Sequence, residues 1–236
     1  MTGLEERIGY EFRDPSLLTL ALTHSSYANE GGTRGRHNER LEYLGDAALE
    51  LITSDLLYHK YPGKSEGELS KLRAALVCEA ALAAAADAIG LRSELILGYG
   101  EEHTGGRKKD SIAADAFEAV LGALYLDGGL AQARAFAETF ALCDIEHKHL
   151  FYDSKTVLQE IVQAQGGTVT YEQTAEEDVY ETRFHMAVLI DGEKRGEGAG
   201  PTKKAAQQKA AYEAVLQYQN GTAHSMSMPK EGRECI

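Results

Sequence analysis

The sequence predicts two domains, an all-α domain followed by a smaller α+β domain of order α-β-β-β-α. Leucine and alanine recur at three- and four-residue spacing as far as about residue 150, the pattern of amphipathic helices. Beyond residues 147–149 the pattern changes to a helix, three alternating segments and a final helix. A length of 236 residues suits one large domain or two small ones. We therefore expect domains at 1–150 and 153–219, followed by a tail at 220–236.

The first domain shows helical spacing without any convincing strand. Its apolar runs lie at residues 17–22, 41–52 and 72–82. An Ala-rich tract at 74–91 is interrupted by Glu79 and Asp87, so it predicts a buried helix of a soluble protein and not a membrane span. Loops are expected where glycine and charged residues gather, at residues 30–36, 63–68 and 100–109.

The second domain opens with a helix expected at 154–165, which Gly166 and Gly167 end as a C-cap. Three segments then alternate like strands, at residues 169–173, 182–190 and 194–199. Asp191 and Gly192 form a hairpin signal between the last two. An Ala-rich helix at 203–218 closes the domain.

The composition restricts which partners the protein can bind and in which compartment it is expected to work. The chain carries 24 Lys and Arg against 37 Asp and Glu, a net charge of −13, and residues 153–219 carry 7 against 11. A polyanion must therefore be held by a local basic patch or through metal ions. The three cysteines form no C-x-x-C pair, and the first ten residues lack an apolar signal core. We expect a reduced, cytoplasmic protein without membrane contact.

Two carboxylate clusters stand out in the helical domain. Glu39, Glu42 and Asp46 fall on one side of a predicted helix, and Asp115 and Glu118 form an i, i+3 pair inside an apolar pattern. Like charges at a half-buried site repel by roughly 4 kcal/mol at 4 Å if the effective dielectric is 20. Such oxygen-only groups suit Mg²⁺ or Mn²⁺ better than zinc. They could equally be helix N-terminal charges or salt-bridge partners, and spacing alone does not decide.

Several motifs resemble the ribonuclease III family. They are NERLEYLGD at 38–46, LALTHSSY at 20–27, EGELSKLRA at 66–74, ADAFEA at 114–119 and YLDGG at 125–129. The order is that of the family and covers nearly the whole chain. The resemblance implies a homodimer that cleaves double-stranded RNA with Mg²⁺, for which Mn²⁺ can substitute.

The resemblance also implies residue roles. Glu42, Asp46, Asp115 and Glu118 would bind the metal, with Asp46 and Glu118 as catalytic residues. Glu39 and Glu66 match two further acidic positions of secondary rank. The implied products carry 5′-phosphate and 3′-hydroxyl ends with short 3′ overhangs, in the processing of precursor ribosomal RNA and the maturation and turnover of structured transcripts.

Other polar residues of the first domain have plainer interpretations. His24 is expected to be a hydrogen-bonded structural residue, because metal-activated water needs no imidazole base. Ser25 and Ser26 lack the context of a nucleophile elbow. Lys108 and Lys109, beside Arg107 in a glycine-rich loop, could contact phosphate or be solvated charges, and the sequence does not choose.

The second domain resembles the double-stranded RNA-binding domain. TVLQE at 156–160 matches its first helix, and GPTKKAA at 200–206 matches the start of its last helix. Thr156, Gln159 and Glu160 would face a minor groove, while Lys203 and Lys204 would bind phosphate.

One loop departs from that family. Where it usually carries Gly-Pro-x-His, this chain has Glu177, Asp178, Val179 and Tyr180. Tyr180 could still donate a hydrogen bond, but the acidic neighbours repel phosphate. We therefore expect weak, salt-sensitive RNA binding by this domain alone.

A rival interpretation is a duplex-RNA-binding protein without catalysis, acting as a regulatory or ribosome-assembly scaffold. It predicts no cleavage of duplex RNA in Mg²⁺. The presence of all four primary carboxylates argues against it.

Overall fold

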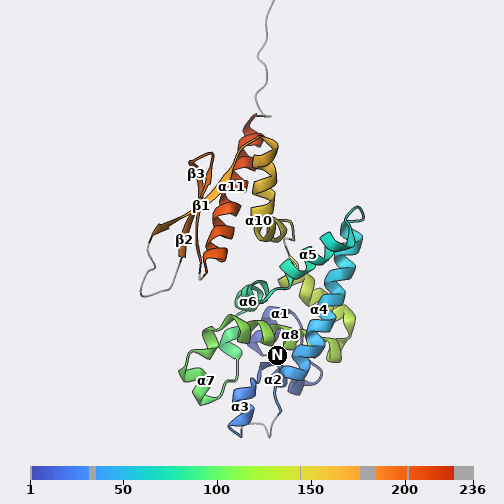
Figure 1. Ribbon diagram of the computed structural model, residues 1–236. Coiled ribbons are helices and arrows are strands. Elements are labelled where there is room, and N and C mark those ends of the chain that lie inside the picture. The colour runs from blue at the N-terminus through green and yellow to red at the C-terminus, as the bar shows by residue number, and fades with distance from the viewer. Residues whose placement is uncertain (1, 32–35, 144, 176–183, 201, 226–236) are drawn as a thin grey trace, which may run out of the picture. The chain divides into compact units, whose positions relative to one another are not determined.

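The computed structural model describes residues 2–31, 36–143, 145–175, 184–200 and 202–225. The chain divides into two compact units, Met1–Ile145 and Glu146–Ile236. The first is helical, and the second joins a three-stranded sheet to two helices (Figure 1). The predicted fold class is confirmed.

The first unit is built around α8, which is buried along most of its length. Phe117, Val120 and Leu121 are fully inaccessible to solvent. Around α8 pack helices drawn from the whole unit. In chain order the elements are α1 (Gly3–Ile8), α2 (Pro15–Leu22), α3 (Ser25–Asn29), α4 (Glu39–Lys60), α5 (Glu66–Leu76), α6 (Glu79–Ala88), η1 (Leu91–Glu94), α7 (Tyr99–His103), η2 (Gly106–Lys108), α8 (Asp110–Gly128), α9 (Leu130–Phe136) and η3 (Ala137–Ala141).

Three expectations for this unit are wrong in detail. The Ala-rich tract at 74–91 is not one helix, because Cys78 adopts an extended backbone that ends α5 and begins α6. This turn lets α5 pack on α4 while α6 packs on α8. The loop expected at 100–109 contains most of α7 and all of η2. The loop at 63–68 is shorter than expected, because a capping box between Ser65 and Glu68 starts α5 at Glu66.

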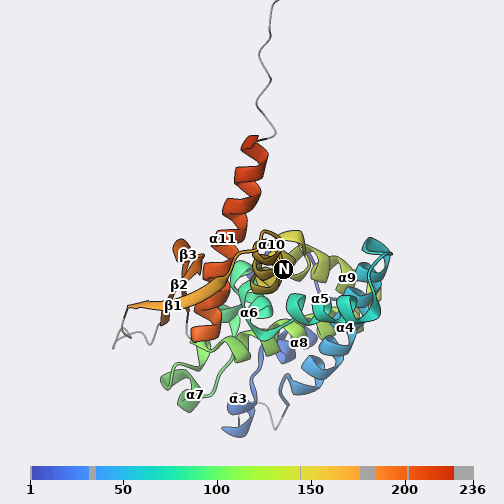
Figure 2. The same ribbon diagram turned by 45° about the horizontal axis from the view of Figure 1, so that its top comes forward.

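The second unit follows the predicted order: α10 (Ile145–Ala164), β1 (Val169–Ala175), β2 (Phe184–Ile190), β3 (Glu193–Gly200) and α11 (Lys203–Ser225). The sheet is antiparallel in the order β1-β2-β3. Asp191 and Gly192 join β2 to β3 with φ of 52° and 84°, as a two-residue hairpin requires. Both helices lie on one side of the sheet in Figures 1 and 2. Leu158, Val188 and Val215 are fully buried between them.

The helices of this unit are longer than expected. α10 begins at Ile145, well before residue 154, and α11 continues to Ser225. Asn220 and Gly221, which indicated the start of a tail, therefore lie within a helix. Their weak helix propensity costs about 1 kcal/mol at most for glycine, too little to end a long helix. In the described part of the chain, no helix is both long and apolar enough to cross a membrane.

Candidate functional site

The predicted carboxylates lie on α4 and α8, which cross and pack against each other. Gly45 faces the backbone of α8 so closely that a Cβ there would lie 1.8 Å from the Glu118 carbonyl oxygen. Gly122 faces α4 in the same way, and its Cβ would lie 2.2 Å from the Leu41 oxygen. Only glycine permits these two approaches. The crossing therefore fixes the distance between the two backbones that carry the carboxylates.

We call Glu42, Asp46, Asp115 and Glu118 the crossing cluster. None of the four makes an ion pair or a hydrogen bond through its side chain to the described residues. Burial, together with the charges of Asp46 and Glu42, raises the pKa of Glu118 to about 8. Burial and neighbouring carboxylates also raise the pKa of Glu42 and of Asp115. The cluster is thus a concentration of negative charge without an ion-paired cation among the described residues, although His24 acts to lower the pKa of Asp115.

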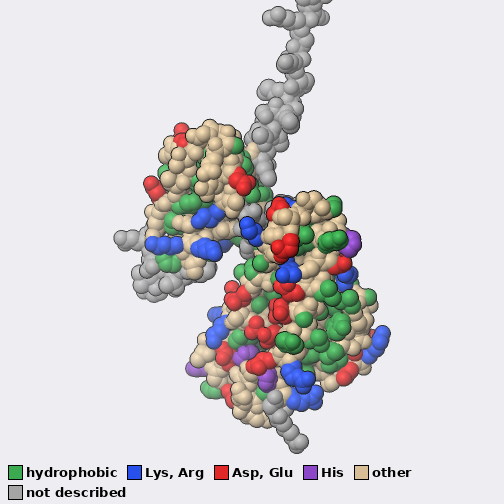
Figure 3. All heavy atoms as spheres, turned by 45° about the vertical axis from the view of Figure 1, so that its right-hand side comes forward, with side chains coloured by type: hydrophobic (Ala, Val, Ile, Leu, Met, Phe, Trp, Pro, Cys, Tyr) green, Lys and Arg blue, Asp and Glu red, His purple; other side chains and the backbone are tan. Residues whose placement is uncertain are grey.

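Further carboxylates surround the cluster. Glu50 lies one turn beyond Asp46 and contributes to the raised pKa of Glu118, while Glu79 at the start of α6 acts on Asp115. The sequence interpretation missed both, although the i, i+4 spacing of Glu50 from Asp46 is a readable signal. Glu39 also raises the pKa of Glu42 and Asp115. Figure 3 shows acidic side chains running as a band down this unit.

Glu66 does not join the cluster within one chain. It opens α5, which follows the last residue of α4, whereas Glu42 lies in the first turn of α4. The intervening 18 residues of α4 span about 27 Å at 1.5 Å per residue. The Glu66 side chain accepts a hydrogen bond from Ser70 at 2.8 Å.

The donor set of the crossing cluster fits a hard divalent cation. Four carboxylates supply only oxygen ligands, and their mutual repulsion is relieved by a positive ion. As placed, however, no three Asp, Glu, His or Cys side chains in the described residues converge closely enough to hold a metal. The glycines at the crossing hold the two backbones close together, and the carboxylate side chains can rotate about their χ angles on that backbone.

His24 has the structural role expected of it. It caps α3, and its Nδ1 accepts a hydrogen bond from the Ser26 backbone N–H at 3.2 Å and lies 2.8 Å from Ser26 Oγ. Its own backbone N–H donates to the Ile96 carbonyl at 3.0 Å. His24 thereby ties the start of α3 to the segment before α7.

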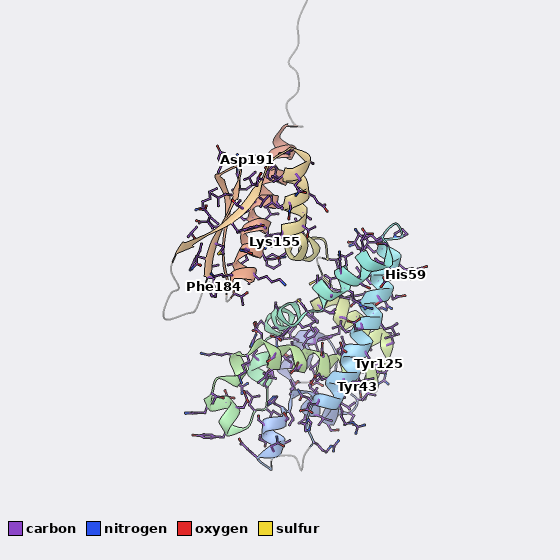
Figure 4. All side chains as sticks on the ribbon, in the orientation of Figure 1. Tyr43, His59, Tyr125, Lys155, Phe184 and Asp191 are labelled. Carbon is purple, nitrogen blue, oxygen red and sulfur yellow. The ribbon has the colours of Figure 1, made fainter. Side chains whose placement is uncertain are left out.

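The outer face of α4 is apolar beside the acidic band. Tyr43 is 80% exposed (Figure 4). Leu51 and Tyr58 are also exposed, and their helical spacing from Tyr43 places them on the same face of α4. Next to this face is a groove of about 470 Å³ with leucines along it and basic residues at its edge. It is lined by Leu17, Leu20, Arg36, His37, Arg40, Leu41, Leu44 and Leu126.

In the second unit, the predicted helix residues are accessible. Thr156, Gln159 and Glu160 are exposed on α10, and Lys203 and Lys204 are exposed at the start of α11. Lys203 Nζ lies 5.9 Å from the centre of the Phe184 ring. Tyr180 and its acidic neighbours lie outside the described residues.

Two cations of the second unit escaped the sequence interpretation. Lys155 donates a hydrogen bond to Gln207 at 2.8 Å and lies 4.7 Å from the centre of the Tyr171 ring (Figure 4). Lys209 is exposed on α11. Neither has a carboxylate partner among the described residues, in contrast to Lys194 with Glu197 and Arg195 with Glu193. Their isolated positions in the sequence gave no signal.

Comparison with known proteins agrees with this geometry. Residues 14–145 match the ribonuclease-III-like family model, and residues 154–218 match that of the double-stranded RNA binding motif. The chain is 46% identical over 229 residues to ribonuclease 3 of Pelotomaculum thermopropionicum, covering 94% of this chain and 95% of the relative. It is 45% identical over 221 residues to ribonuclease 3 of Bacillus licheniformis, covering 91% and 88%.

A solved structure matches the first unit. The nuclease domain of ribonuclease III from Campylobacter jejuni superposes with a TM-score of 0.56 at 42% identity, covering 59% of this chain and 94% of that domain. That structure was described for flexibility in a region involved in dimer formation.

Proposed function

The chain belongs to the ribonuclease III family, and we propose that it cleaves double-stranded RNA at the crossing cluster with Mg²⁺, for which Mn²⁺ can substitute. An endoribonuclease specific for double-stranded RNA is the activity of this family, and both of its domains are present. The observation that supports the proposed site is the crossing at Gly45 and Gly122, which sets α4 against α8. At this crossing the charges of Asp46, Glu42 and Asp115 act on the Glu118 carboxyl.

The chain's own residues have distinct tasks in this proposal. Asp46 and Glu118 act as catalytic residues, and Glu42 and Asp115 complete the metal-binding set. A bound divalent cation supplies activation of water and neutralisation of charge on the phosphate. Glu39 borders the set, and Glu66 is too distant to join it within one chain. Gly45 and Gly122 hold the two helices at the separation that the ligands require.

Cleavage of a long RNA duplex tests the function directly. The purified protein is incubated with the duplex in Mg²⁺, in Mn²⁺ and in a chelator. Discrete short products in either metal, and none in the chelator, are expected. The proposal further expects 5′-phosphate and 3′-hydroxyl ends with short 3′ overhangs, which end-labelling detects. Stable binding without products in every metal would favour the scaffold alternative.

The second unit supplies duplex binding in this proposal. Lys203 and Lys204 bind phosphate, while Thr156, Gln159 and Glu160 face a minor groove, where recognition follows RNA shape. Tyr180 is a further candidate donor. We propose functional boundaries at 1–150 and 153–219. Removing 153–236 should leave a folded nuclease that cleaves at low salt and loses activity as ionic strength rises.

We also propose a homodimer formed through the first unit. The apolar face of α4 and the adjacent groove offer a continuous surface that water solvates poorly. Leu44 and Leu126 line the groove from α4 and α8, so the face extends across both helices of the crossing. A mass measurement in solution tests this assignment, and a monomer at micromolar concentration would contradict it.

In the cell, we propose cytoplasmic processing of precursor ribosomal RNA and structured transcripts.

A further inference from the structure

The segment before α8 displays three consecutive cations on a tightly folded turn. Gly105 has a φ of +81°, and a Cβ on Gly106 would lie 2.5 Å from the side chain of Glu101. The backbone N–H groups of Lys108 and Lys109 donate to the carbonyls of Gly105 and Gly106, both at 2.9 Å. The backbone of this turn is therefore fixed, and its cations are presented at defined positions.

Arg107 is committed to the fold. Its Nε donates to the Glu102 carboxylate at 3.0 Å, and its terminal nitrogens donate to the carbonyls of Arg92 and Leu95. The side chain is half-buried. With all its donor groups engaged, Arg107 fastens η2 to η1 and cannot turn toward an external anion without losing these bonds.

Lys109 is committed as well. Its Nζ lies 2.7 Å from Glu101 Oε1, and this hydrogen bond lowers the pKa of Glu101. The Lys109 carbonyl accepts a hydrogen bond from Arg92 at 2.9 Å, and Arg92 also pairs with Asp110 at the start of α8. The turn and the first residue of α8 are thus held together.

Lys108 differs from both neighbours. It is exposed, and it has no ion pair, side-chain hydrogen bond or ring contact among the described residues. It lies two residues before α8 begins at Asp110, and Asp115 of the crossing cluster follows five residues into that helix, about 7.5 Å along its axis. Phosphates follow one another about every 3.4 Å of axis along one strand of duplex DNA, and their spacing in duplex RNA is of the same order. A strand whose phosphate reaches Asp115 therefore carries others within reach of Lys108.

We propose that Lys108 is a phosphate-binding residue of the catalytic unit, which holds the backbone of duplex RNA a few nucleotides from the bond that is cut. This inference rests on the proposed function of the crossing cluster. Because that cluster and its neighbours are acidic, RNA approaching it meets repulsion on either side of the metal. A free cation on a rigid turn offsets that repulsion at one defined phosphate, whereas Arg107 and Lys109 do not.

Three substitutions in the full-length protein test this assignment: Lys108→Ala, Lys109→Ala and Lys64→Ala. All three remove one positive charge, but Lys109 and Lys64 are already paired, with Glu101 and Glu68. Duplex binding is titrated in Ca²⁺ at several salt concentrations, and steady-state cleavage is measured in Mg²⁺. Lys108→Ala should weaken binding about fivefold at 0.15 M salt and reduce the salt slope by about 0.9. The loss should fall on KM more than on kcat, and Lys108→Arg should restore it.

The two control variants should bind within about twofold of the parent protein, because neither lysine is expected to contact a phosphate. Their salt slopes should therefore not show the loss of about 0.9 that accompanies one lost phosphate contact. Equal weakening of binding by Lys108→Ala and Lys109→Ala would overturn the assignment. It would indicate that both lysines act through general electrostatic attraction and not through one specific phosphate contact. Parent-like binding of Lys108→Ala would overturn it too. Failure of the parent protein to cleave would reject the proposed function, while the binding series would still decide the role of Lys108.

Discussion

The middle and the end of α8 carry carboxylates in opposite situations. Asp127, near the C-terminal end, accepts hydrogen bonds from the Tyr10 hydroxyl at 2.7 Å and from the backbone N–H groups of Arg13 and Asp14 at 2.9 and 3.0 Å. Burial alone would raise the pKa of Asp127, but these bonds outweigh it and lower the pKa. Burial and four neighbouring carboxylates instead raise the pKa of Glu118 to about 8.

The comparison distinguishes charged groups that have partners within the fold from charged groups that are available to bind a ligand. The Asp127 carboxylate accepts hydrogen bonds from the N-terminal segment, whereas Glu118 has no cation or donor in the described part of the chain. Cations divide in the same way. Arg107 and Lys109 have carboxylate partners, and so do Lys194 and Arg195. Lys108, Lys203 and Lys204 have no carboxylate partner among the described residues. An unpartnered charge on a rigid element is therefore a candidate ligand-binding group in this protein.

The largest effect should come from Glu118→Gln. Losing one charged ligand removes several kcal/mol of transition-state stabilisation, which lowers the cleavage rate roughly a thousandfold. Duplex binding should stay nearly intact, because the lysines are untouched. Cleavage of a labelled duplex in millimolar Mg²⁺ measures the rate, and replacing Mg²⁺ by Ca²⁺ should likewise permit binding without turnover. Asp46→Asn should behave alike.

The matched control is Asp127→Asn, the same chemical change in the same helix. It should cleave at close to the parent rate at a temperature where it is folded. A Glu118→Gln variant that cleaves as fast as Asp127→Asn would show that the unpartnered carboxylate has no catalytic role, and the comparison would fail.

Stability should respond in the reverse order. Asp127→Asn weakens three hydrogen bonds to a charged acceptor and should lower the free energy of unfolding by about 2 kcal/mol. Glu118→Gln should not destabilise the metal-free protein at neutral pH, because the neutral glutamine replaces a carboxyl whose charged form burial and the neighbouring carboxylates disfavour. Urea unfolding of both variants in chelator measures the two values. A larger loss of stability for Glu118→Gln would mean that Glu118 has a structural partner.

The second unit offers the same comparison with cations. The full chain with Lys203→Ala and Lys204→Ala should bind duplex RNA roughly tenfold more weakly and lose about two units of salt slope. The control with Lys194→Ala and Arg195→Ala removes the same charge from paired positions and should lose little. Tyr180→Ala should also cost little. Titration at several salt concentrations distinguishes them, and a dominant effect of Tyr180→Ala would move recognition to the divergent loop.

The sequence predicts those features that depend on local patterns, but not those that depend on contacts between distant segments. Helical spacing was enough to place Glu42 with Asp46 and Asp115 with Glu118, because i, i+3 and i, i+4 residues share a helix face. Apolar alternation and the Asp191-Gly192 turn were enough for the sheet. The meeting of α4 with α8 depends on the absence of side chains at Gly45 and Gly122, which has no local signal. The commitment of Arg107 to Glu102 and distant carbonyls likewise depends on contacts that only the fold creates.

The smallest expected effect is on the pH dependence of stability, where the two ends of α8 should differ in sign. A carboxyl with a raised pKa holds its proton more tightly in the folded chain, so the stability it contributes is present below its unfolded value of 4.5 and is lost as the pH rises toward about 8. A carboxyl with a lowered pKa contributes stability above its unfolded value of 3.8, which is lost as the pH falls through its folded pKa. In chelator, the parent protein should therefore lose melting temperature relative to Glu118→Gln between about pH 4.5 and 8. The difference in melting temperature between the parent protein and Asp127→Asn should stay constant over that range and shrink only in acid.

Mg²⁺ at pH 8 should raise the melting temperature of the parent more than that of Glu118→Gln, because only the parent keeps the full set of ligands. Parallel melting curves for the parent and Glu118→Gln across this range would show that the Glu118 charge is already balanced within the fold.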